Sequence, residues 1–126
     1  MPAFDTTLLP TAPTATAPDG SNVRVLLRLD TASMIHIQLA AGHTSSAVAH
    51  RSVDEIWYIL DGSGEMWRSQ AGRSQVVRLE PGLCLTIPLG THFQFRASSS
   101  AALTAVATTM PPWPGDDEAV AVPGNW

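Results

Sequence analysis

Histidines and carboxylates carry most of the chemistry that this sequence offers. Of the 126 residues, the seven basic ones are all arginine, none is lysine, and Cys84 is the single cysteine. The absence of lysine excludes a Schiff base, a pyridoxal anchor and a phosphate-binding P-loop. One cysteine excludes an internal disulfide framework and a multi-cysteine zinc site. Polar catalysis or metal binding therefore depends on the four histidines and the acidic residues.

The charge and hydropathy of the chain bear on its partners. Eleven carboxylates outnumber the seven dispersed arginines, which gives a formal net charge of −4. A nucleic-acid surface needs a basic patch, so we expect no nucleic-acid partner. No apolar run approaches the roughly 20 residues of a membrane helix. Residues 1–22 lack the features of a secretory signal, so we expect no membrane partner and a cytoplasmic location.

The most informative spacing lies between Gly42 and Gly62. Five residues separate Gly42 from Val48-Ala49-His50, four separate His50 from Glu55, and six separate Glu55 from Gly62. This stretch resembles the first motif of the cupins, small β-barrels of jelly-roll type. In that motif a glycine precedes a His-x-His pair, a glutamate and a second glycine. Every spacing fits, but Val48 stands where the first histidine is expected.

A second stretch matches the other cupin motif in the same way. Gly82 is followed by five residues and then by Pro88-Leu89-Gly90, and the next expected ligand, a histidine, falls on Phe93. His92 stands one residue early. The resemblance covers residues 23–109. It implies a small single-domain bacterial cupin of the conserved-barrel type with degenerate metal-ligand motifs.

In the cupins these motif positions form a three-histidine, one-carboxylate site for iron, manganese, nickel, copper or zinc. By resemblance, the metal ligands here are His50 and Glu55. His36 or Gln38 adds a third ligand if their face turns inward, and His92 adds one if a bulge shifts the register. Divalent transition metals usually take at least three protein ligands. We therefore expect no bound metal, and one divalent transition metal is the alternative.

The same alignment predicts the lining of a barrel pocket. Residues i and i+2 of a strand share a face, so the inward side chains are mostly apolar, with one imidazole and one carboxylate. They are Val48, His50, Glu55, Trp57, Ile59, Phe93 and Phe95. A His–Glu pair can also transfer protons without a metal. The alternative is that the aromatic members of this set only fill the core, and no catalytic residue is assigned.

Short strands separated by turn residues must position these groups. No stretch shows the period of an amphipathic helix. The nine expected strands span residues 23–29, 34–40, 47–50, 55–60, 65–69, 75–79, 83–87, 91–96 and 103–108. Strands at this spacing favour a sandwich or a barrel. The predicted fold class is all-β, a cupin-type jelly-roll (double-stranded β-helix) barrel in one domain, with Cys84 in its core.

The two ends of the chain differ from this barrel, which is expected over residues 23–109. Residues 1–22 are rich in proline, threonine and alanine and are expected as an extended arm. Residues 110–126 form a tail that contains proline and tryptophan. We expect this tail to pack Trp113 across the barrel mouth or against a partner subunit.

Three functions remain open on the sequence alone. The first is a small-molecule-binding cupin of undetermined substrate, with a largely apolar pocket and an incomplete metal site. The second is a metal-dependent enzyme of oxygenase, isomerase or cyclase type that uses His50, Glu55 and a borrowed ligand. The third is a non-catalytic sensor or structural homodimer. The resemblance implies a homodimer in any case, and pairing through edge strands would remove exposed edges.

Overall fold

The computed structural model describes residues 2–17, 19–115 and 117–126, in which eleven strands and no helix are present. The strands are β1 (Ala15–Thr16), β2 (Asn22–Arg28), β3 (Ser33–Leu39), β4 (Val48–His50), β5 (Asp54–Asp61), β6 (Gly64–Gln70), β7 (Arg73–Leu79), β8 (Cys84–Ile87), β9 (His92–Ala97), β10 (Leu103–Met110) and β11 (Ala119–Ala121). Accordingly, the described ranges hold no helix able to cross a bilayer.

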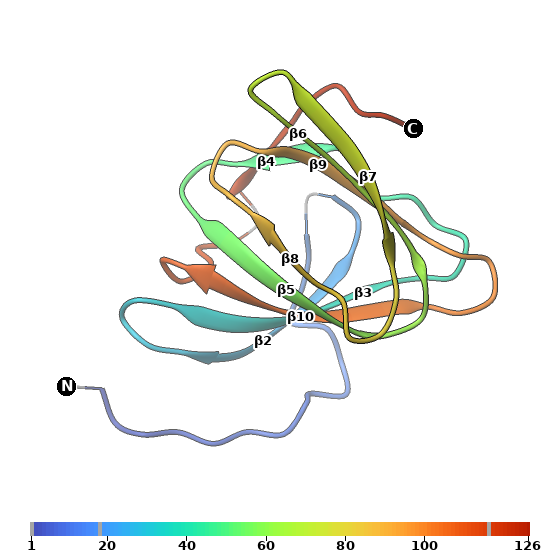
Figure 1. Ribbon diagram of the computed structural model, residues 1–126. Helices are drawn as coiled ribbons and strands as arrows, with labels where there is room; N and C mark the ends of the chain where they lie inside the picture. The colour runs from blue at the N-terminus through green and yellow to red at the C-terminus, as the bar shows by residue number, and fades with distance from the viewer. Residues whose placement is uncertain (1, 18, 116) are drawn as a thin grey trace.

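Two antiparallel sheets face one another as layers (Figure 1). One sheet has the strand order β1-β2-β3-β10-β5-β8, and the other has the order β11-β4-β9-β6-β7. Strands distant in sequence are therefore neighbours: β10 lies between β3 and β5, and β9 lies between β4 and β6. This arrangement confirms the prediction of an all-β jelly-roll barrel.

All nine strands expected from the sequence are present, with ends displaced by a few residues. The sequence did not predict β1 and β11, which lie in the two end segments. Both are too short to show a period of two. The strand β1 pairs with β2 next to it, whereas β11 crosses the fold to pair with β4, where Val120 lies opposite Ala49. Each end segment thus adds a strand to the barrel.

Alternating burial along the strands builds the core. On β5, Glu55, Trp57 and Ile59 are buried while the residues between them are exposed. The Trp57 ring meets Phe95 of β9 edge-on, with ring centroids 5.2 Å apart, so the two sheets pack directly against each other. Each large apolar side chain buried in this way stabilises the fold by about 1.5–3 kcal/mol.

The expectation that Cys84 lies in the core is wrong. On β8 the inward positions are Leu85 and Ile87, so the alternation of the strand leaves Cys84 exposed with Thr86 on the outer face. An apolar neighbourhood in sequence did not reveal which of the two faces is buried.

A close approach between β6 and β9 requires glycine at position 64. A Cβ atom built on Gly64 would overlap the backbone carbonyl oxygen of Arg96 on the paired strand. Because both atoms belong to backbone held in a ladder, a side chain cannot be accommodated there by a rotamer change. The first residue of β6 must therefore be glycine for this strand to pair with β9.

Candidate functional site

A small cavity inside the barrel is closed by both ends of the chain. Its volume is about 30 Å³, enough for one or two water molecules. Strands β3, β4, β5 and β9 form its walls. The lining is completed by four residues of the N-terminal side and two of the tail: Ala17, Asp19, Ser21, Val23, Trp113 and Ala119. Trp113 also packs against the hydrophobic core. Of the two positions expected for this tryptophan, the structure shows the one across the barrel.

The polar groups of the cavity centre on His50, the last residue of β4. Its Nε2 atom lies 3.2 Å from Oε1 of Glu55, and its Nδ1 atom lies 3.8 Å from Oε1 of Glu118. These are ionic contacts rather than aligned hydrogen bonds, since neither ring nitrogen has a hydrogen-bond partner among the described residues. The imidazole also stacks on the ring of Phe93, with centroids 5.3 Å apart.

These surroundings shift the titration of His50. Burial disfavours the imidazolium and lowers the pKa of His50, but the contact with Glu55 and the charges of Glu118 and Asp19 raise it more. The net result is a pKa above the ordinary value of 6.5. His50 therefore holds its proton at a higher pH than a free histidine, as expected for an imidazole among carboxylates.

Glu55 is fixed by two neighbours. The carboxylate is 3 % exposed, and its Oε1 atom accepts a hydrogen bond from Nε1 of Trp57 at 2.9 Å. Both side chains project inward because they lie two residues apart on β5. The indole thus holds the carboxylate beside His50, where Oε1 lies 3.2 Å from Nε2.

Glu118 anchors the tail beside His50. It is 2 % exposed, and its carboxylate accepts hydrogen bonds from the Ser52 amide at 2.7 Å, the Ser52 hydroxyl at 2.8 Å and the Val53 amide at 2.9 Å. The backbone joins as well, because the amide of Arg51 donates to the carbonyl of Glu118 at 2.8 Å. The loop after β4 therefore binds the tail through one buried carboxylate.

Asp19 adds a third carboxylate from the other end of the chain. Its Oδ1 atom accepts from the amide and the hydroxyl of Ser21, at 2.8 Å and 2.6 Å. Burial raises the pKa of Asp19, and Glu55 adds to the effect, while the hydrogen bonds from Ser21 and the charge of His50 oppose it. The net result is a pKa of Asp19 above its ordinary value of 3.8.

Five of the seven residues expected in the pocket line this cavity: Val48, His50, Glu55, Trp57 and Phe93. The other two, Ile59 and Phe95, are fully buried in the core and do not line it. The sequence reasoning missed Asp19 and Glu118. An aspartate before a glycine and one member of an acidic run look like ordinary turn or surface residues, so no local signal distinguishes them.

The borrowed ligands considered for a metal do not reach the cavity. Ile35 and Ile37 line it, so His36 between them lies on the opposite face of β3. There, burial and then the charge of Arg24 lower the pKa of His36. The register between β9 and β6 runs unbroken, so no bulge turns His92 inward.

Comparisons with known proteins support this architecture. No family model matches the chain, and no curated protein matches it. Solved structures do match. A Klebsiella pneumoniae protein with a double-stranded β-helix domain is 13% identical, with a TM-score of 0.66, covering 82% of this chain and 85% of that one. The cupin domain of Cnp3 from Schizosaccharomyces pombe is also 13% identical, with a TM-score of 0.65, covering 72% and 61%. The chain has the cupin fold.

A third cupin-fold match has a described reaction. Pac13 of Streptomyces, a nucleoside dehydratase, is 16% identical, with a TM-score of 0.64, covering 82% of this chain and 79% of that one. At this identity the likeness concerns the fold alone.

The side chains at this site do not fit the metal that proteins of the cupin fold often hold. Within the described ranges, no three histidine, cysteine or acidic side chains are arranged to hold an ion. Phe93, at a cupin ligand position, places its ring against the imidazole of His50. Val48 and Phe93 are hydrocarbon side chains at two of the four cupin ligand positions. The site therefore has too few donor atoms for a divalent transition metal.

Proposed function

We propose that this chain binds a small organic molecule inside the barrel, and that His50 with Glu55 exchanges a proton with it. One observation carries the proposal: a buried imidazole borders the cavity with both ring nitrogens free of hydrogen bonds among the described residues. A buried polar group without a partner costs free energy, about 1–3 kcal/mol. A ligand that bonds to His50 would recover that cost.

The chemistry available to the pair is general acid–base catalysis. Oε1 of Glu55 stands 3.2 Å from Nε2 of His50. The carboxylate can therefore accept a proton from the imidazolium or stabilise its positive charge. The raised pKa of His50 favours a role as proton donor near neutral pH. Pac13, of the same fold, is a nucleoside dehydratase, and dehydration also needs a proton for the leaving hydroxyl. The substrate of this chain stays open.

Ligand entry requires the barrel to open. Small-molecule sites usually have volumes of about 300–1,000 Å³, at least about ten times the 30 Å³ found here. The tail residues Trp113 and Ala119 cover the cavity, and the tail is the proposed gate. Its hold on the barrel through Glu118 sets how readily it opens.

Nuclear magnetic resonance tests the proposal. Uridine and a panel of small neutral aromatic molecules are added to labelled protein while the His50 ring and the Trp57 indole N–H are followed. We expect one class of compound to shift both signals, and His50→Ala to abolish binding. His43→Ala changes an exposed histidine and is the matched control. Binding that survives in His50→Ala, or no shift with any compound, would contradict the proposal.

The metal-dependent alternative has its own test. We expect protein purified without a chelating column to contain far less than one metal ion per chain, because His50 and Glu55 are too few ligands. Metal content is measured by mass spectrometry of the elements. Stoichiometric iron, manganese or zinc that is lost in His50→Ala would favour the metal-dependent enzyme instead.

We also propose a cytoplasmic homodimer. Support comes from exposed apolar side chains on the outer face of one sheet: Met34 on β3, with Ile56, Tyr58 and Leu60 on β5, each 42–48% exposed. This face, rather than the edge strands expected from the sequence, offers the apolar area for association. Analytical ultracentrifugation should show a dimer that Ile56→Glu disrupts. Cell fractionation tests the location.

A further inference from the structure

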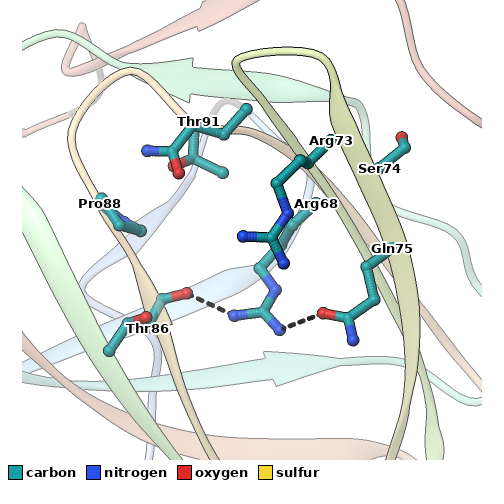
Figure 2. Close-up of a pocket in the computed structure, with 8 residues that line it drawn as sticks. Arg68, Arg73, Ser74, Gln75, Thr86, Pro88 and Thr91 are labelled. Atoms are coloured by element: carbon teal, nitrogen blue, oxygen red, sulfur yellow. Dashed lines mark hydrogen bonds between the residues drawn. The ribbon is translucent and has the colours of Figure 1, made fainter.

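A second cavity, separate from the His50 site, lies between β6, β7 and β8. Its volume is about 310 Å³, and it shares no lining residue with the His50 cavity. Figure 2 shows Arg68 of β6 and Arg73 of β7 with their guanidinium groups in this groove. The strands β7 and β8 are the edges of the two sheets, so the groove follows the seam where the layers meet. Its size falls within the range of small-molecule sites.

The positive charge in this groove is not neutralised by the protein. Arg68 donates to the carbonyl oxygen of Thr86 at 2.8 Å and to Oε1 of Gln75 at 3.3 Å, both uncharged acceptors. In residues 2–17, 19–115 and 117–126, neither Arg68 nor Arg73 forms an ion pair with a carboxylate. Burial lowers the pKa of the Arg68 guanidinium. Two unpaired cations in a chain of net charge −4 form a local site for negative charge.

Thr91 supplies a second, independent indication. Its side chain lines the groove and is 2% exposed, yet its hydroxyl has no hydrogen-bond partner among the described residues. Buried hydroxyls are usually hydrogen-bonded, and an unpaired one costs stability. A polar ligand in the groove would satisfy it.

We propose that this groove binds an oxyanion, a phosphate or carboxylate group on a small organic molecule. The Thr86 and Gln75 contacts hold the planar guanidinium of Arg68 in place and leave further N–H groups for the anion. Arg73 makes no side-chain hydrogen bond within the described residues and adds a second donor fork. Guanidinium groups match the geometry of both anions through paired N–H donors, and the Thr91 hydroxyl completes the set.

Titration of labelled protein with inorganic phosphate, and separately with succinate, at constant ionic strength tests this site. We expect the Arg68 and Arg73 Nε–H signals and the Thr91 amide to shift, while the Trp57 indole N–H of the other cavity does not. Arg73→Gln should raise the dissociation constant at least about tenfold, which corresponds to the binding free energy of one charge-assisted hydrogen bond. Tighter binding of phosphate would indicate a phosphorylated ligand, and tighter binding of succinate a carboxylic acid.

Two further variants separate a built site from general surface charge. Arg78→Gln removes the same charge from β7 outside the groove, where Arg78 pairs with Glu80, and should leave binding unchanged. Thr91→Val should weaken binding several-fold without lowering the stability of the free protein, because the lost hydroxyl has no partner. The proposal is overturned if neither anion binds, or if Arg78→Gln weakens binding as much as Arg73→Gln.

Discussion

Replacing Glu118 by alanine should detach the tail from the barrel. The carboxylate accepts hydrogen bonds from the Ser52 amide, the Ser52 hydroxyl and the Val53 amide. Ser52 is exposed, so its amide and hydroxyl can bond to water instead. Each of these two lost bonds to the charged acceptor costs about 1.5 kcal/mol. Val53 is fully buried, and its unpaired amide costs a further 1–3 kcal/mol or so. The expected loss of unfolding free energy in Glu118→Ala is therefore about 4–6 kcal/mol.

Urea denaturation followed by tryptophan fluorescence measures this loss. Glu118→Gln keeps the oxygen that accepts both amides and should cost only about 1 kcal/mol. Asp117→Ala is the matched control, because it removes the neighbouring charge while, within the described residues, the one hydrogen bond of Asp117 is that of its backbone carbonyl with Nε of Arg51. The reasoning is refuted if Glu118→Ala unfolds within about 0.5 kcal/mol of the wild type, or if Asp117→Ala costs as much.

Three other results are expected. Because the folded pKa of His50 is raised, its contribution to stability is complete below about pH 6.5 and disappears as the pH rises through the folded pKa. In urea denaturation from pH 5.5 to 9, the difference in unfolding free energy between wild type and His50→Gln should therefore shrink as the pH rises. A constant difference would contradict this. Gly64→Ala should cost more than about 3 kcal/mol in thermal unfolding, since its Cβ overlaps the Arg96 carbonyl, whereas Gly72→Ala meets open space and should cost about 1 kcal/mol from its positive φ. Trp113→Ala should lose about 2 kcal/mol and bind small aromatic compounds in the barrel more tightly by NMR; unchanged binding would exclude the tail as the gate.

The sequence by itself determined nine of the strands and the framework of the barrel, but not β1 and β11. Period-two alternation depends only on neighbouring residues, so the inward set of β5 was readable in advance. The glycine spacings around Gly42, Gly62 and Gly82 carry turn geometry, which is also local. Motif spacing likewise placed His50 and Glu55 on one inner surface, and the structure brings them to 3.2 Å.

Only the tertiary structure decided what surrounds that pair. The charges of Glu118 and Asp19 act on His50 from opposite ends of the chain, and the reduction of the pocket to about 30 Å³ follows from the residues that cover it. The groove of Arg68 and Arg73 exists because β8 of one sheet lies beside β6 and β7 of the other. Such contacts depend on how distant strands pair and on which segments close the barrel. A local pattern of residues carries no information about either.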